Sequence, residues 1–200
     1  MISTWRPFSC WRLIAMTMLA LTMIGVSSGN VSAAPNCNLA RDLIGANLVR
    51  CVLNGADLSG VDLMDATMRG AKLRGANLRG ADFRFANLAV VDFTGADLSG
   101  ADLSGANLHG AIFVNANLSQ AKFIDSNLSA GRLLNTKARG ASFLGANLTG
   151  TDFTGADLRS IDFTDAIAWS TDFSGADYDG MDVTNMLVWN VTGVPWANSR

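Results

Sequence analysis

The sequence has 200 residues, a net charge of −2 and 17 acidic residues, all of which are Asp. It contains one His and no Glu, so it offers few of the side chains that serve as general acids and bases in enzymes. Three Lys, 20 Gly and abundant Asp and Asn also argue against a mostly helical protein.

Residues 1–33 have the composition of a secretory signal peptide. Arg6 and Arg12 provide positive charge, Leu13 to Val26 is a largely apolar run, and Val31 to Ala33 supplies small residues before a cleavage site at Ala34. The run is short for a membrane span, although an uncleaved N-terminal anchor remains the alternative. We therefore expect export to the periplasm, a thylakoid lumen or the extracellular space, and no membrane span in the mature chain.

Residues 34–41 precede the regular part of the sequence and are expected to form an N-terminal cap. Cys10 leaves with the signal peptide, so Cys37 and Cys51 remain. Export permits disulfides, and a Cys37–Cys51 bridge would attach the cap to the first coil. The alternative is two free, buried thiols.

Residues 42–190 repeat with a period of five. Every fifth residue from Leu43 to Val188 is apolar or Ala, the residue two before it is mostly Ala, and Asp or Asn mostly lies between them. Five residues turn about 500° on an α-helix, and an odd period sends alternate side chains to opposite faces of a flat strand. The chain must therefore coil, with two inward residues on each side of the coil and the Asp or Asn pointing outward.

The aromatic residues indicate how many sides each coil has. Eight Phe residues fall on alternate five-residue units, which implies an even number of sides, and a two-sided coil is too tight to hold them. Four sides let the larger and smaller side chains interdigitate at interior packing density. The eight are Phe83, Phe93, Phe113, Phe123, Phe143, Phe153, Phe163 and Phe173.

Runs such as Ala96-Asp97-Leu98-Ser99-Gly100 resemble the pentapeptide-repeat family, whose consensus is A(D/N)LXX. The match covers about thirty consecutive units. The resemblance implies an all-β fold, a right-handed quadrilateral parallel β-helix of about seven and a half coils, roughly 35 Å long at a strand spacing of about 4.8 Å.

The two ends of such a solenoid need covering, because open strand edges favour aggregation. Residues 191–200 are expected to form a C-terminal cap or tail. Trp189, Val191, Val194, Pro195 and Trp196 are apolar outside the repeat pattern, and packing in this cap explains them better than an aromatic cofactor site.

Counting by four units divides the outward residues among the sides of the rod. One side presents Asp42, Asp62, Asp82, Asp102, Asp162 and Asp182, and the next presents Asn47, Asn87, Asn107, Asn127 and Asn147, whose stacked amides could hydrogen-bond into a ladder. The second side lacks acid in this outward position and also carries aromatic residues. Its candidate partner-binding residues are Asn87, Asn107, His109, Asn127, Trp169 and Trp189.

The sequence favours a non-catalytic, exported interaction rod that binds an unknown protein partner, with a homodimer as one possibility. It predicts no cofactor, small-molecule substrate or metal site, because two Cys and a distant His109 do not make a tetrahedral set. An acidic rod that mimics DNA and binds an enzyme such as gyrase, as some members of the resembled family do, is the alternative. Export opposes it, as does a ring of basic residues at Arg69, Lys72, Arg74, Arg79 and Arg84, and no nucleic acid partner is expected.

Overall fold

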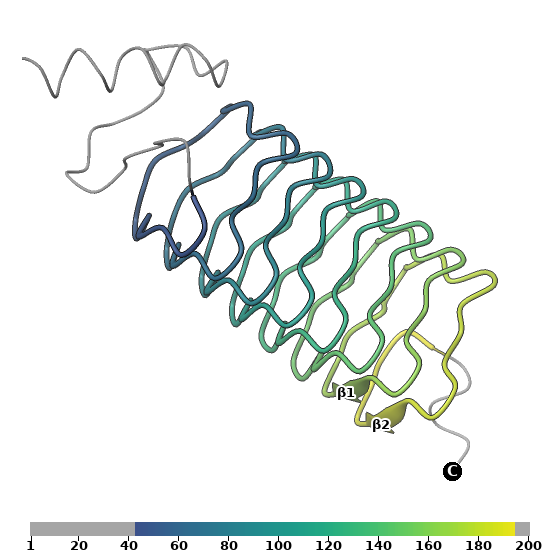
Figure 1. The fold of residues 1–200 in the computed structure, drawn as a ribbon. Coiled ribbons are helices and arrows are strands. Elements are labelled where there is room, and N and C mark those ends of the chain that lie inside the picture. The colour runs from purple at the N-terminus through teal and green to yellow at the C-terminus, as the bar shows by residue number, and fades with distance from the viewer. Residues whose placement is uncertain (1–42, 195–200) are drawn as a thin grey trace, which may run out of the picture.

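The computed structural model describes residues 43–194, which form a rod of stacked coils (Figure 1). The predicted signal peptide (1–33), the predicted N-terminal cap (34–41) and residues 195–200 of the predicted C-terminal cap lie outside the described residues, so those assignments stay predictions. Residues 43–194 contain parallel β-bridges and turns and no helix. The prediction of an all-β solenoid is confirmed for this part of the chain.

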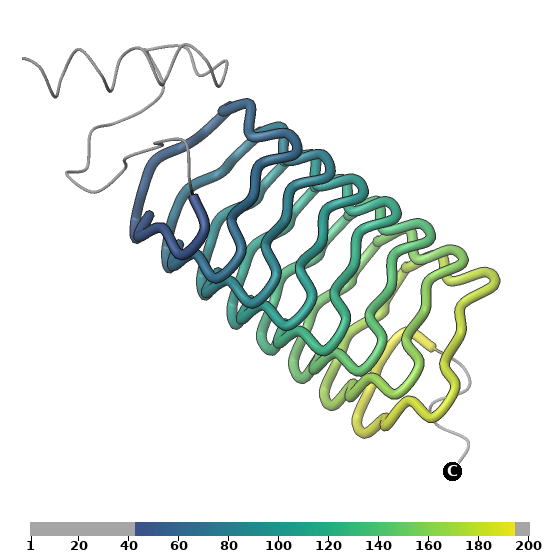
Figure 2. The backbone as a smooth tube through the Cα atoms, viewed as in Figure 1, coloured from purple at the N-terminus to yellow at the C-terminus, as the bar shows by residue number. Residues whose placement is uncertain are grey.

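Each coil takes twenty residues, which is four five-residue units. Asn47 pairs with Thr67, and Thr67 pairs in turn with Asn87, always in parallel. The same offset continues to the last described coil, where Asp172 pairs with Thr192. Figure 2 shows the chain winding through these coils without a break.

The four sides of the rod are named here by their units. Face A contains residues 61–65, face B residues 66–70, face C residues 71–75 and face D residues 76–80, and each face recurs every twenty residues along the chain. The five-residue stretch that one face takes from one coil is called a rung. Faces A and C lie opposite each other, as do faces B and D.

Backbone hydrogen bonds tie each rung to the rungs before and after it. The Leu58 N–H donates to the Asn77 carbonyl at 2.8 Å, and the Asn77 N–H donates to the Ala56 carbonyl at 2.9 Å. Within a coil, the Ala56 N–H donates to the Leu53 carbonyl at 3.1 Å and closes the turn between two units. Each face of a coil has one bridging residue, and these hydrogen bonds satisfy the backbone N–H and carbonyl groups around it.

The core is a continuous column of apolar side chains inside the square coil. All eight predicted Phe residues are fully buried, and they lie on the opposed faces A and C. The Phe93 and Phe113 rings stack at 4.9 Å along face C, while Phe113 meets Phe123 of face A edge-on at 6.0 Å. The prediction that opposite sides carry the larger residues is therefore confirmed.

The repeat keeps its register where inward residues depart from the consensus. Ala138 is fully buried, and its neighbour Lys137 pairs with Asn117 before it and with Asp157 after it, so the chain forms no bulge there. At four positions a buried Ser or Thr replaces Ala. Each of their hydroxyls donates to a backbone carbonyl; Thr151, for example, reaches Leu128 O at 3.0 Å, so these buried polar groups are satisfied.

The corners of the coil place the fifth residue of a unit in the left-handed region. Most of these residues are Gly, whose φ angles lie near +65°, as in Gly100 and Gly150. The outward Asp or Asn supports the same corner, because its Oδ1 accepts the N–H two residues later, as from Ser99 to Asp97 at 3.0 Å. Asp and Asn thus support the turn as well as being tolerated at the surface.

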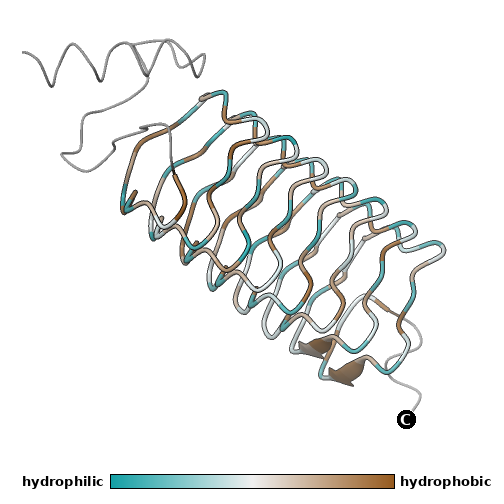
Figure 3. Cartoon of the chain, viewed as in Figure 1, coloured by the Kyte–Doolittle hydropathy of each residue, from teal (hydrophilic) through white to brown (hydrophobic). Residues whose placement is uncertain are grey.

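Two segments of face B form regular strands at the C-terminal end of the rod. Strand β1 (Ile167–Trp169) pairs in parallel with strand β2 (Leu187–Trp189), and Trp169 lies opposite Trp189. Figure 3 shows both strands as hydrophobic segments at the surface of the last coils. Beyond β2, Val191 and Val194 are buried, whereas Trp189 is 68% exposed, so within the described residues Trp189 is not covered by a cap.

Candidate interaction face

Face B brings together all the residues that the sequence nominated for partner binding. Asn87 pairs with Asn107, and Asn107 pairs with Asn127. His109 follows Asn107 on the same rung, and Trp169 and Trp189 lie at its C-terminal end. The eight described rungs of face B, from 46–50 to 186–190, contain no Asp. The outward-pointing second residue of each five-residue unit is called its slot. Every Asp that occupies a slot in the described chain lies on face A, C or D.

The Asn residues of face B do not form the side-chain ladder suggested by their spacing. Within residues 43–194 each Asn oxygen instead accepts a backbone N–H two residues on, at 3.2 Å from His109 to Asn107 and at 3.1 Å from Ser129 to Asn127. Amide-to-carboxylate bonds occur on face D, where the Asn77 Nδ2 donates to Asp57 at 2.9 Å and the Asn117 Nδ2 donates to Asp97 at 3.0 Å. The prediction of an Asn ladder on face B was therefore wrong: these side chains support the corner turns instead.

His109 lies on this acid-free surface and contacts a hydroxyl of the neighbouring coil. Its Nδ1 lies 2.9 Å from the Ser129 hydroxyl on the next rung. Among the described residues, no set of three His, Cys or Asp side chains is placed to hold a metal ion. The polar groups of face B are amides, hydroxyls, one imidazole and the guanidinium groups of Arg50 and Arg69.

Exposed apolar side chains gather on face B and its borders. Six large apolar residues of the described chain are exposed, and Ile44 of face A is the exception to this grouping. Trp169, Leu187 and Trp189 form a patch on β1 and β2, beside half-buried Ile167. The other two, Phe85 and Val90, are on the corners at either side of one rung. Contiguous exposed apolar surface is typical of interaction sites.

Phe85 and Val90 adopt a backbone conformation that their side chains disfavour. Their φ angles are +60° and +53°, at corners where the repeat mostly has Gly. Each side chain extends over the next coil, where Gly105 and Gly110 leave room for it. Phe85, Val90 and Leu187 are not among the candidates nominated from the sequence. The detectable signal was a bulky apolar residue at a position of the repeat that needs a positive φ.

The predicted basic ring is largely neutralised by the Asp residues around it. Arg74 lies 3.8 Å from Asp92 and Arg79 lies 3.3 Å from Asp97, both on the following coil. The Arg84 guanidinium hydrogen-bonds Asp82 within its own unit, holding the pKa of that carboxyl below its usual range. Faces A, C and D therefore present paired charges there.

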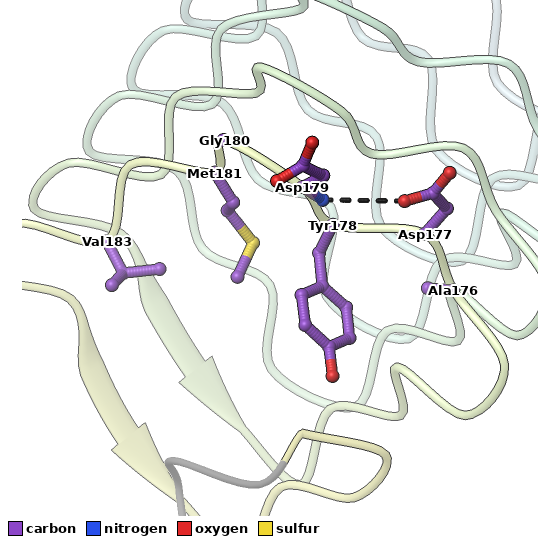
Figure 4. A pocket seen from close by; sticks show the side chains of 7 residues that line it. All are labelled: Ala176, Asp177, Tyr178, Asp179, Gly180, Met181 and Val183. Carbon is purple, nitrogen blue, oxygen red and sulfur yellow. Dashed lines mark hydrogen bonds between the residues drawn. The ribbon is translucent and has the colours of Figure 1, made fainter.

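A shallow hollow of about 500 Å³ opens at the C-terminal end of the rod (Figure 4). It is lined by residues 176–181 and Val183, with the Tyr178, Met181 and Val183 side chains beside it. These inward-facing residues belong to the last coils of the described chain and are half-buried. The Asp179 N–H donates to Asp177 at 3.4 Å, so even here the acidic side chain supports a turn.

Cys51 occupies an inward position and is fully buried, while Cys37 lies outside the described residues. The Cys37–Cys51 bridge stays a prediction. Exported protein should have a mature mass two hydrogens below that of the dithiol. Reduction should lower the free energy of unfolding by about 2–3 kcal/mol, because the closed loop is short. Finding two free thiols in natively exported protein would refute the bridge.

Comparisons with known proteins identify the repeat. The model for pentapeptide repeats (8 copies) matches residues 36–70 and 62–100, and the model for a pentapeptide repeat region matches residues 86–163. A search of curated proteins gives no match.

Solved structures of pentapeptide-repeat proteins also resemble this chain. HetL, a protein involved in heterocyst differentiation regulation in the cyanobacterium Nostoc, is 23% identical over 77% of this chain and 93% of HetL, with a TM-score of 0.43. The full-length plasmid-mediated fluoroquinolone resistance protein QnrB1 is 20% identical over 74% of this chain and 91% of QnrB1, with a TM-score of 0.28. A thylakoid lumen protein of Arabidopsis thaliana is 33% identical over 52% of this chain and 66% of its own, with a TM-score of 0.24. The five-residue repeat and the family models together show that the chain belongs to the pentapeptide-repeat family.

Proposed function

We propose that the chain is an exported, non-catalytic interaction rod that binds a protein partner through face B. The observation behind this proposal is the gathering of five of the six exposed large apolar side chains, within residues 43–194, on one acid-free face and its borders. Aromatic residues are enriched at binding hot spots, where truncation typically costs about 2 kcal/mol or more.

The rigid repeat suits this role better than it suits catalysis. Each coil contacts its neighbours through backbone bonds at every rung, so face B is a flat, fixed surface about 35 Å long. The charges on the other faces are involved in turns and ion pairs. A fixed surface with few reactive groups supports recognition.

The acidic DNA-mimic alternative has less support from the surface. A DNA mimic needs unpaired negative charge at regular spacing. Here Lys122 and Ser142 interrupt the Asp column of face A, and Arg159 contacts both Asp157 and Asp177 on face D. The signal peptide proposed for residues 1–33 also directs the chain away from DNA enzymes.

A double Trp169→Ser, Trp189→Ser variant tests the proposal. Both side chains are exposed, so the variant should keep the β-type circular dichroism and melting temperature of the parent. It should lose the partner that the tagged parent captures from the exported fraction. Ile112→Ser, which changes a half-buried apolar slot residue on face C, should keep that partner.

Two results would contradict the proposal. If the double Trp variant unfolds from its C-terminus, the two residues belong to a structural cap. If it folds and keeps every partner while an Asp62→Asn, Asp82→Asn, Asp102→Asn variant loses them, the acidic surface is the binding site.

A further inference from the structure

We propose that the partner of face B is a second copy of this chain, docked side by side about a two-fold axis parallel to the rod. This inference rests on the proposed function, because it uses the same face. The resulting interface is isologous: if residue i of one copy contacts residue j of the other, then residue j of the first copy also contacts residue i of the second.

Net charge restricts which face two copies can share. The chain is acidic overall, and the slots of faces A, C and D all contain Asp. Face A has the densest charge, with Asp at five of its seven described outward positions and at the corners Asp65, Asp125 and Asp165, so two copies of face A would repel each other. Face B has no Asp on its rungs, so two acidic rods can approach each other there without that repulsion.

The parallel axis matches the rungs of face B to themselves. It places the second copy at the same height and reverses the direction in which each rung crosses the face. The start of a rung therefore meets the end of the same rung on the partner. Phe85 then lies opposite Val90, Ile167 opposite Trp169, and Leu187 opposite Trp189, so every large exposed apolar side chain of this face meets another.

The polar rungs between the two apolar regions are matched in the same way. Asn107 faces His109, Asn127 faces Ser129, and Asn147 faces Thr149. The Asn oxygens already accept backbone N–H groups, which leaves their amide hydrogens as donors toward the partner's hydroxyls and imidazole. These groups can all be satisfied across the axis.

One pair of charged residues at the borders of face B is complementary under this symmetry. Asp65 is on the corner where its rung begins, and Arg69 is near the corner where the same rung ends. The axis brings Arg69 of one copy to Asp65 of the other, twice in the dimer. A two-fold axis perpendicular to the rod and centred on the eight described rungs would instead bring Asp65 of one copy against Asp165 of the other, which places like charges together. Charge therefore selects the parallel arrangement.

The first experiment measures the mass of the purified exported chain by sedimentation velocity from about 1 to 100 µM. We expect twice the chain mass at the upper end. An Asn107→Asp, Asn127→Asp variant keeps both corner turns, because Asp accepts the same N–H in other units, and adds four negative charges to the interface. Its dissociation constant should rise at least tenfold. The matched control Ile112→Asp, Ser142→Asp adds the same charge on faces C and A and should remain dimeric.

The second experiment tests the axis by exchanging charges. Arg69→Asp alone and Asp65→Arg alone should each weaken the dimer by about fivefold or more, and the double exchange should restore it. A monomer at every concentration overturns the inference, and so does a dimer that the Asn107→Asp, Asn127→Asp variant leaves intact. A monomeric chain whose Trp169→Ser, Trp189→Ser variant loses a different protein would contradict self-association alone and leave the proposed function standing.

Discussion

Replacing Phe113 with Asp should unfold the coils on either side of it. Phe113 is fully buried, stacks on Phe93 and meets Phe123 edge-on. The variant would place an unpaired carboxylate in an apolar column and remove a large side chain, so we expect a loss of more than about 5 kcal/mol of unfolding free energy. Circular dichroism and urea titration would measure this loss as a lower midpoint or as two separate transitions.

Val114→Asp provides the matched control, since Val114 is the next residue of the same unit and points outward, half-buried. It should change the unfolding free energy by less than about 1 kcal/mol. Equal effects of the two variants would mean that the core does not depend on the Phe column. Because each coil contacts only its neighbours, damage at Phe113 should spread by nearest-neighbour loss, and coils far from it should unfold last.

The fold was predictable because its information is local and repeated. The pattern of inward residues and turn residues recurs in every five-residue unit. A single departure from it, such as Ala138, therefore does not shift the register set by the neighbouring units. The alternation of Phe with smaller residues then predicted four sides. The same pattern is repeated in about thirty units, so the prediction of the fold does not depend on any one of them.

The surface was less predictable because it depends on competition between partners. From sequence alone, Asn107 could bond its neighbours on the stack or its own corner, and only the geometry shows that the corner takes the oxygen. The pairing of Arg79 with Asp97 depends likewise on the reach of a long side chain between coils. Phe85 was not predicted because it lies at a corner with a positive φ, outside the inward positions at which the repeat places apolar residues.

Acid should destabilise the rod, because its outward carboxylates accept the corner hydrogen bonds more strongly when they are ionised. The pKa of Asp57 is lowered mainly by the Ser59 hydroxyl and backbone N–H, and the pKa of Asp182 is lowered by the same pair of groups from Thr184. Arg84 lowers the pKa of Asp82 through its hydrogen bonds. A carboxyl whose folded pKa lies below its unfolded value contributes stability above the unfolded pKa and loses it as pH falls through the folded one.

Thermal melts at a series of pH values would measure this effect. The melting temperature should stay level from pH 7 to about pH 5 and then fall below about pH 4, near the ordinary pKa of Asp. An Asp57→Asn, Asp182→Asn variant should match the parent at pH 7, because Asn accepts the same N–H in units such as Asn147 to Thr149. It should lose less of its stability in acid, because an amide does not titrate.

Repulsion between stacked carboxylates acts in the opposite direction. Asp152 pairs with Asp172, and Asp162 pairs with Asp182, so protonation would relieve like charges on neighbouring coils. Two charges about 5 Å apart in water repel by only about 0.8 kcal/mol before salt screening. Each carboxylate, by contrast, accepts a short turn bond, such as the 2.9 Å bond from the Thr184 N–H to Asp182. We therefore expect the turn bonds to dominate, and a melting temperature that rises between pH 7 and pH 3 would show that repulsion between the Asp columns is the larger effect.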